Sequence, residues 1–193
     1  MGLTRYFERR NLKHSGEPGD DAKEYDAPIF VIHEHKASNH HFDFRLECDG
    51  VLKSWAVPKG LSTDPREKRL AVQTEDHPLA YASFEGVIPE GEYGAGPVLL
   101  WDEGPFDNAT RQEGRPVTLT RALEDGFAEI RLHGHKLCGG YVLKKFDSAE
   151  GDDKWLIIKK ADDEADARRN PVSTEPQSVK SGRKIDELKE QDQ

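Results

Sequence analysis

The chain has 193 residues, which is enough for one domain with a hydrophobic core. Hydrophobic residues make up 35% of it and charged residues 34%, a balance that predicts a compact domain joined to solvated segments. The sequence has no run of about 18 apolar residues, so we expect no transmembrane helix and no membrane partner. The net charge of −9 argues against nonspecific binding of nucleic acid but is compatible with a local basic site.

The N-terminal region, residues 1–27, has no periodic apolar pattern and carries the glycines and prolines typical of loops. We therefore expect a loop-rich arm, with a basic and aromatic stretch at residues 5–13. The region lacks the apolar stretch of a signal peptide, so a cytoplasmic location is expected. The two cysteines of the chain are then expected to be free thiols.

Short apolar alternations begin at residue 28 and predict a series of strands. These strands cover residues 29–35, 41–48, 51–58, 69–75, 97–102, 127–133, 141–146 and 154–160. Residues 118–126 hold either one helical turn or a long connection. Eight short strands at regular spacing predict a mainly β domain over residues 28–161, either a barrel or a closed sandwich. The fold that we expect is a compact antiparallel β-barrel of about eight strands with short helical segments.

The C-terminal region, residues 162–193, contains no aromatic residue and many charged ones. Such a composition buries too little apolar surface to offset the entropy of ordering the chain. We therefore predict a disordered or weakly helical tail.

The predicted strand at residues 41–48 has two faces of opposite character, because side chains on a strand alternate between its sides. The apolar face carries Phe42, Phe44, Leu46 and Cys48, and the ionic face carries His41, Asp43, Arg45 and Glu47. A two-residue turn at Asp49-Gly50 fixes the register with the next strand. It pairs Phe42 with Val57, Asp43 with Ala56, Phe44 with Trp55 and Arg45 with Ser54. The small partners leave space for a ligand above the ionic face.

Four histidines lie within residues 33–41, close to this ionic face. Two imidazoles and a carboxylate at close range are suitable ligands for Mn²⁺, Zn²⁺ or Fe²⁺. Arg45, about 6–7 Å along the strand from Asp43, carries a guanidinium that binds anionic oxygens bidentately. A metal beside an arginine suits a phosphate group. The spacing alone leaves a second interpretation open, a solvated strand face with incidental histidines.

Several separate motifs occur in an order that resembles a known family. They are H-x5-H-F-D-F-R-L-E at residues 35–47, DGVLKSWAVPKG at 49–60, EDHPLAYASFEGVIPEGEYGAG at 75–96 and KWLIIKK at 154–160. Over about residues 5–160, the chain resembles the 3′-phosphoesterase domain of bacterial DNA ligase D and its stand-alone relatives. The resemblance implies a β-barrel enzyme that depends on Mn²⁺, with other divalent transition metals as alternatives.

The resemblance also implies an activity and a set of partners. Members of the family remove a 3′-terminal ribonucleoside, leaving a 3′-phosphate, and then hydrolyse that phosphate to a 3′-hydroxyl for nonhomologous end joining. The implied substrates are the 3′ ends of DNA or of DNA–RNA primer-templates. The implied partner proteins are separate ligase, polymerase and Ku proteins, and the chain itself is expected to be a monomer.

The site residues that the resemblance implies fall into three groups. The metal ligands are His35, His41 and Asp43, and the scissile phosphate is bound by Arg45 and His77. Further positions of the active-site surface are Arg10, Glu17, Lys59, Arg69 and Tyr81, so the arm of residues 1–27 contributes to the site. The chain departs from the family pattern at Asn11, His33 and Phe42, where Asp, Gln and Tyr are common. Asn11 and His33 are expected to affect the balance between the two activities.

His77 is expected to stabilise charge on the phosphate oxygens together with Arg45, and to protonate the leaving oxygen near neutral pH. Without the resemblance, His77 would be interpreted as a local hydrogen-bonding residue, and Lys59 and Arg69 as surface side chains. The glycine-rich residues 86–96 suit sharp backbone turns and lack the pattern of a triphosphate-binding loop.

Two functions of other classes remain as alternatives. One is a noncatalytic module that binds DNA ends and recruits repair proteins through its arm and tail. The other is a metal-dependent hydrolase or oxygenase of small molecules. The basic arm, Lys59 and Arg69 favour a nucleic-acid substrate.

Overall fold

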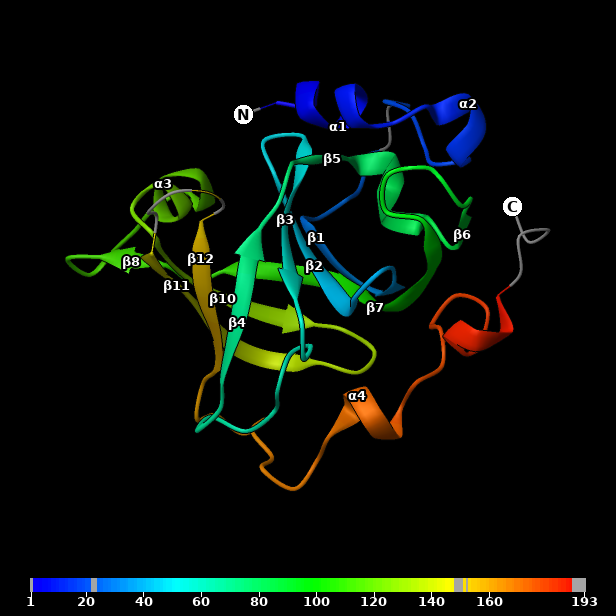
Figure 1. Cartoon of the computed structure of the whole chain (residues 1–193). Helices are drawn as coiled ribbons and strands as arrows, with labels where there is room; N and C mark the ends of the chain where they lie inside the picture. Colours follow the sequence, from blue (N-terminus) through cyan, green and yellow to red (C-terminus); the bar gives the residue numbers. More distant parts are fainter. Residues whose placement is uncertain (1, 22–23, 148–150, 152, 189–193) are drawn as a thin grey trace.

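The computed structural model describes residues 2–21, 24–147, 151 and 153–188. Eight antiparallel strands form a closed barrel, which confirms the predicted fold class (Figure 1). In order around the barrel they are β1 (Ile29–Lys36), β2 (His40–Cys48), β3 (Val51–Val57), β4 (Lys68–Gln73), β12 (Lys154–Lys159), β11 (Cys138–Asp147), β10 (Phe127–His133) and β7 (Gly96–Asn108). The pairing of β7 with β1 closes the barrel.

Shorter elements connect and cover these strands. The short strands are β5 (His77–Pro78), which pairs with β3, β6 (Gly86–Ile88), which pairs with β7, and the hairpin of β8 (Arg111–Gln112) and β9 (Arg115–Pro116). The helices are α1 (Thr4–Arg9), α2 (Leu12–Ser15), η1 (Leu79–Ser83), α3 (Leu119–Glu124), α4 (Pro171–Thr174) and η2 (Ile185–Glu187). Of the two alternatives for residues 118–126, a helical turn or a long connection, the structure has the helix, α3. In the described part of the chain, none of the helices has the length and apolar character needed to cross a membrane.

The hairpin of β2 and β3 has the register that the sequence predicted. Asp49 and Gly50 have φ values of 51° and 78°, so both adopt the left-handed conformation that a two-residue turn of type I′ requires. Asp43 consequently lies opposite Ala56 and Arg45 lies opposite Ser54. This register puts the ionic face of β2 on the outside of the barrel and its phenylalanines inside.

Aromatic side chains fill the interior of the barrel. The ring centroid of Trp55 lies 6.2 Å from that of Phe44 and 5.8 Å from that of Trp155, so three strands meet through one stack. Phe42 packs edge-on against Trp101, with 5.6 Å between the ring centroids. Phe42 therefore faces the core, as expected.

A second apolar layer covers the outer face of β1, β3 and β7. It consists of Tyr6, Val31, Leu52, Tyr81, Ala82, Phe84, Ile88, Val98 and Leu100. The covering side chains come from α1, η1 and β6, which lie together over the barrel (Figure 1). This wall of the barrel is therefore buried on both sides. As a result, polar side chains on the outer face of β1 and of the neighbouring strand β2, among them His33, Asp43 and Arg45, are enclosed.

The N-terminal arm is folded onto this wall by Tyr6, whose side chain is fully buried and donates a hydrogen bond to the carbonyl of Pro18 over 2.7 Å. The arm contains two short helices, whereas the sequence predicted only loops. Propensity gave no signal for helices of six and four residues, because helices this short depend on tertiary packing.

The sequence predicted a disordered or weakly helical tail. In the structure residues 162–188 are ordered along the barrel and include the short helices α4 and η2. Ile185 and Leu188 are buried in the main core. The backbone N–H of Val179 donates to the carbonyl of Leu100 over 3.0 Å, and the indole N–H of Trp101 donates to the carbonyl of Glu175 over 2.9 Å. Isolated apolar residues and main-chain hydrogen bonds hold the segment, and neither produces a periodic sequence pattern. Residues 189–193 lie outside the described residues.

Removal of the Phe44 ring tests the interior stack. We expect Phe44→Ala to lower the free energy of unfolding by about 3–5 kcal/mol, because the substitution leaves a cavity between Phe30 and Trp55. Phe146, which is 53% exposed, supplies the control, and Phe146→Ala should change stability by less than about 0.5 kcal/mol. Urea unfolding of both variants would measure the difference, and equal stabilities would contradict this view of the core.

Candidate active site

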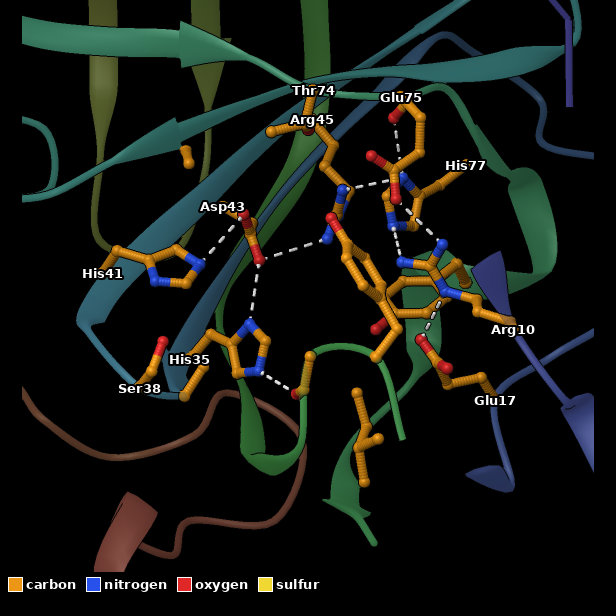
Figure 2. A pocket seen from close by; sticks show the side chains of 16 residues that line it. Arg10, Glu17, His35, Ser38, His41, Asp43, Arg45, Thr74, Glu75 and His77 are labelled. Carbon is orange, nitrogen blue, oxygen red and sulfur yellow. Dashed lines mark hydrogen bonds and ion pairs between the residues drawn. The ribbon is translucent and has the colours of Figure 1, made fainter. Parts of the chain in front are cut away.

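A cavity of about 320 Å³ lies between the outer face of the β1–β2–β3 wall and its covering layer. Side chains from the arm, from the three strands and from residues 74–94 line it (Figure 2). Eight of the ten site residues expected from the sequence come together here: Arg10, Glu17, His35, His41, Asp43, Arg45, His77 and Tyr81. Ala56, the small partner of Asp43, also lines the cavity, so the predicted open space above the ionic face is present.

Three of these residues form a group that could hold a metal ion. Donor atoms of His35, His41 and Asp43 all lie within 4.8 Å of one another. The pairing of β1 with β2 puts His35 directly opposite His41. Nδ1 of His35 lies 3.5 Å from one oxygen of Asp43, and Nε2 of His41 lies 3.4 Å from the other. Figure 2 shows both rings directed at this carboxylate.

The outer contacts of the two histidines select the tautomers that a metal ligand needs. Nε2 of His35 lies 2.7 Å from the carbonyl oxygen of Gly94, and Nδ1 of His41 lies 2.8 Å from that of Asn39. A carbonyl oxygen only accepts, so each of these nitrogens carries the proton. Nδ1 of His35 and Nε2 of His41 face the carboxylate of Asp43, and a metal ion bound there would take the place of any proton that these nitrogens share with it. Carbonyl contacts of this kind are usual behind metal-bound histidines.

The charges of the group suit a cation. Burial by itself would raise the pKa of Asp43, but the charge of Arg45 and hydrogen bonds from both histidines hold that pKa well below its usual value. Burial lowers the pKa of His41, yet the hydrogen bond and charge of Asp43 outweigh it and raise this pKa above its usual value. Asp43 is therefore ionised, and the three donors fit a divalent transition metal.

Arg45 connects the metal group to His77. One of its terminal nitrogens lies 3.2 Å from Asp43, and the other donates to the hydroxyl of Ser54 over 2.8 Å and lies 3.1 Å from Nδ1 of His77. On the other side of the ring, Nε2 of His77 lies 3.2 Å from a terminal nitrogen of Arg10. Both ring nitrogens of His77 lie near a guanidinium, which only donates, but Nδ1 also faces an acceptor, the Glu75 carbonyl at 2.9 Å. The proton of the neutral ring is therefore assigned to Nδ1, and Nε2 accepts from Arg10.

This arrangement makes His77 a neutral imidazole. Burial, followed by the charges of Arg45 and Arg10, holds the pKa of His77 well below its usual value. The expectation that His77 protonates a leaving oxygen near neutral pH does not agree with this direction. Two guanidiniums on either side of a buried ring oppose a third positive charge. The sequence could not indicate this, because the second guanidinium comes from the distant arm.

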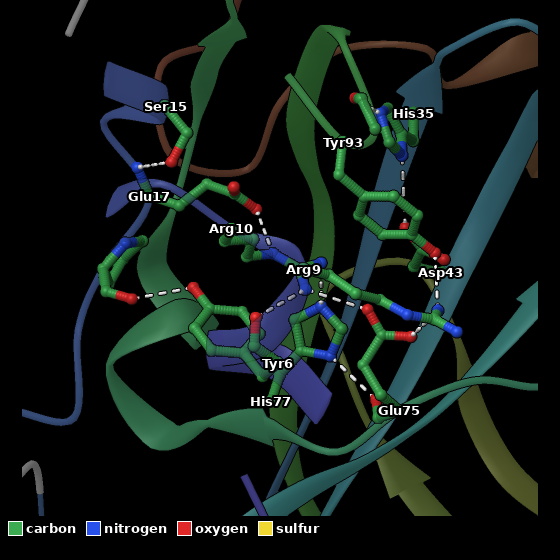
Figure 3. A network of polar contacts seen from close by, with 12 residues as sticks. Tyr6, Arg9, Arg10, Ser15, Glu17, His35, Asp43, Glu75, His77 and Tyr93 are labelled. Carbon is green, nitrogen blue, oxygen red and sulfur yellow. Dashed lines mark hydrogen bonds and ion pairs between the residues drawn. The ribbon is translucent and has the colours of Figure 1, made fainter. Parts of the chain in front are cut away.

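Arg10 joins the arm to the cavity. It donates to Glu17 over 2.9 Å and to Glu75 over 2.9 Å, and its guanidinium carbon lies 4.2 Å from the centroid of the Tyr6 ring (Figure 3). Burial by itself would lower the pKa of Arg10, but the charge of Glu17 and the hydrogen bonds to both carboxylates raise it. Arg10 is therefore a fixed positive charge at the cavity.

Tyr81 and His33 contact each other edge to face next to Arg45. The ring of Tyr81 is edge-on to His33, with 5.5 Å between the centroids, and the guanidinium carbon of Arg45 lies 5.0 Å from the Tyr81 centroid. Burial raises the pKa of Tyr81 well above its usual value, so the phenol stays neutral. Burial and then the charge of Arg45 lower the pKa of His33 to about 3. Neither His33 nor Asn11 is among the described residues that line the cavity.

The structure does not bring Lys59 and Arg69 to this cavity. Among the described residues they line a separate hollow, together with Pro58 and Leu70. Arg69 donates to Glu67 over 2.6 Å, and Lys59 is exposed. On β4, the neighbour of Ala56 is Val72, so Arg69 lies three residues further along the strand.

Sequence reasoning missed Glu75, Tyr93 and Gly94, all of which line the cavity. Glu75 binds Arg10, and its position two residues before His77 was the one available signal. Gly94 contributes only its carbonyl oxygen, which leaves no mark in the sequence. The interpretation of residues 86–96 as turns agrees with the positive φ values of Gly91 and Gly94.

Metal titration tests the three-donor group. We expect His41→Ala to weaken Mn²⁺ binding by more than about 100-fold, since losing even an outer partner of a metal ligand lowers affinity about 10–100-fold. His40 is the matched control, because it lies beside His41 but contacts Glu34 over 2.8 Å. Isothermal titration should give His40→Ala the affinity of the wild type. Equal Mn²⁺ affinity in both variants would rule out this site.

Comparison with known proteins identifies the family of the chain. The family model described as "DNA Ligase D 3'-phosphoesterase domain" matches residues 33–145. The "Multifunctional non-homologous end joining protein LigD" of Pseudomonas aeruginosa is 41% identical over an alignment of 191 residues, which covers 95% of this chain and 22% of that protein. The "Multifunctional non-homologous end joining DNA repair protein LigD" of Mycobacterium tuberculosis is 46% identical over an alignment of 156 residues, which covers 80% of this chain and 19% of that protein. The chain thus spans about a fifth of the length of these relatives. On this match and these identities, the chain belongs to the family of DNA ligase D 3′-phosphoesterase domains.

Proposed function

We propose that this chain is a metal-dependent hydrolase that repairs the 3′ ends of DNA. In this proposal it removes a 3′-terminal ribonucleoside and then the remaining 3′-phosphate, and it leaves a 3′-hydroxyl for nonhomologous end joining. The observation that carries the proposal is the group of His35, His41 and Asp43 beside Arg45 in one cavity. Membership of the phosphoesterase family gives the reaction class.

The charges around the cavity explain why an anionic substrate would need a metal. Apart from its histidines, the described lining of the cavity includes two guanidiniums, of Arg10 and Arg45, and three carboxylates, of Glu17, Asp43 and Glu75. These fixed charges sum to one negative charge, so the cavity by itself does not attract phosphate. A divalent cation on the three donors makes it positive, so substrate affinity and metal occupancy become linked.

The residues of the chain then have separate roles. Bound Mn²⁺, or another divalent transition metal, supplies a Lewis acid to a phosphoryl oxygen. Arg45 and Arg10 supply fixed positive charges for the remaining oxygens. His77 accepts a hydrogen bond from Arg10 and contacts Arg45, so its neutral ring orients both guanidiniums.

The relatives guide the proposed partners. The names of these relatives describe multifunctional proteins of nonhomologous end joining, and one of the names specifies DNA repair. We extend this process to the chain, with DNA or DNA–RNA primer-template ends as substrates. Ligase, polymerase and Ku proteins would be the partners that use the 3′-hydroxyl.

End trimming in vitro tests the proposed function. A primer–template with a 3′-ribonucleotide or a 3′-phosphate would be incubated with Mn²⁺, Mg²⁺, Zn²⁺ or a chelator. We expect Mn²⁺-dependent conversion to a 3′-hydroxyl, a loss of more than about 100-fold in His41→Ala, and wild-type activity in His40→Ala. Tight binding of the ends without conversion under any metal would instead indicate a noncatalytic end-binding module.

The protonation of His77 gives a second test. A lowered pKa means that the unfolded chain takes up a proton at about pH 6.5 while the folded chain does not. Stability should therefore fall as the pH drops below that value, and His77→Gln should reduce this loss. In ¹⁵N NMR spectra of the metal-free protein, the His77 ring should stay neutral at pH 6 with its proton on Nδ1. A His77 resonance that titrates near pH 6.5 would contradict the assigned role.

A further inference from the structure

One large aromatic side chain at the cavity stays open to solvent. Tyr93 lines the cavity, yet 46% of it is exposed, whereas Tyr6 and Tyr81 are almost fully buried. Tyr93 therefore lies where the cavity meets the solvent. An exposed ring at this position adds little to the core, so a role in stability does not explain it.

The backbone around Tyr93 is tied to the metal group. The next residue, Gly94, accepts the hydrogen bond of His35 through its carbonyl oxygen over 2.7 Å. Gly94 has a φ of 76°, a conformation that side chains other than glycine rarely adopt. The backbone next to Tyr93 is thus anchored to His35, one of the three proposed metal ligands.

The arm fixes the orientation of the ring. Arg9 donates to the hydroxyl of Tyr93 over 2.9 Å and, from the same nitrogen, to Glu75 over 3.2 Å. The guanidinium carbons of Arg9 and Arg10 each lie 5.2 Å from the centroid of the Tyr93 ring. Figure 3 shows the hydroxyl end of the ring directed at Arg9. The side chain is therefore held in one orientation before any ligand arrives.

The size and polarity of the cavity determine what would reach this ring. Its volume of about 320 Å³ is near the lower limit for ligand pockets, and its lining includes the charged groups of Arg10, Asp43 and Arg45. A phosphate bound to these groups and the sugar that carries it would take up much of this space. The base of a nucleotide whose 3′-phosphate lies at Arg45 would therefore extend to the mouth. Every base has a π-face that stacks on an aromatic ring, whatever the sequence.

We propose that Tyr93 is the stacking platform for the base of the 3′-terminal nucleotide. This inference rests on the proposed function and adds a subsite to it. Stacking at the mouth would hold the terminal nucleotide against the metal group without reading its sequence. The cavity would then favour nucleotide ends over other phosphate esters of similar charge.

The test compares two 3′-phosphate strands that differ only in whether the last sugar carries a base. We expect Tyr93→Ala to lower kcat/KM on the base-bearing strand about 10-fold or more, mainly through KM, because base–aromatic stacking contributes about 1–3 kcal/mol. Tyr93→Leu, which keeps apolar volume without a π-face, should show a similar loss. Tyr93→Phe should stay within about 3-fold of the wild type. On the abasic strand, the alanine, leucine and wild-type proteins should be alike.

Phe7→Ala is the matched control. Phe7 is an aromatic residue of the N-terminal arm that is 40% exposed, but it is absent from the described lining of the cavity. It should leave both strands unaffected, and thermal melting would check that every variant is folded. Equal losses on the two strands in Tyr93→Ala would mean that the ring only shields Arg10 and Glu75, which overturns the stacking role. The stacking role is also overturned if the wild type has the same kcat/KM on both strands and Tyr93→Ala does not change it. A wild-type protein inactive on both strands with every metal would overturn the proposed function itself.

Discussion

The carboxylate of Asp43 is the interaction on which the rest of the site depends. It is enclosed by the covering layer, and its two oxygens are shared among His35, His41 and Arg45. A buried carboxylate is unfavourable without partners, so the neighbouring groups are required to bring positive charge or hydrogen-bond donors. From Arg45 the contacts continue through His77 and Arg10 to the arm. The folded arm and the charged side chains of β2 are thus connected by one network of polar contacts.

Burial on both sides of the β1–β2–β3 wall gives this network its strength. Charges that face solvent are screened, whereas the same charges under an apolar cover interact over short distances in a low dielectric. The cover is apolar where it contacts Val31 and Leu52 and polar where it contacts the ionic face. A single layer therefore seals one part of the wall and completes a cavity over the other.

Much of this arrangement could be predicted from local sequence. The alternation of β2 and the turn at Asp49-Gly50 determine the register, and the register determines which side chains surround Asp43. Contacts between distant segments could not be predicted in the same way. The lowered pKa of His77 depends on Arg10, from a different part of the chain, and the carbonyl of Gly94 has no side-chain signature.

The two largest differences between sequence and structure have a common physical origin. The tail is held by scattered apolar residues such as Ile185 and by main-chain hydrogen bonds, for which composition gives no signal. Arg69 lies three residues from Val72, the partner of Ala56, so the alternation of β4 puts its side chain on the opposite face of the strand and away from the cavity. In both cases the relevant partner is set by the closed barrel, which a one-dimensional pattern does not contain.

The C-terminal segment has a consequence for where the working unit ends. The hydroxyl of Ser178 donates to Glu85, and the ammonium of Lys180 donates to the carbonyl of Ser83. The segment therefore supports the end of η1 and the residues directly after it. Those residues belong to the layer that carries Tyr81 over the cavity. A fragment trimmed after the last barrel strand would retain every strand of the barrel and lose these contacts behind the layer that covers the cavity. A fragment for expression or fusion should therefore extend at least to Leu188, whose side chain is buried in the core.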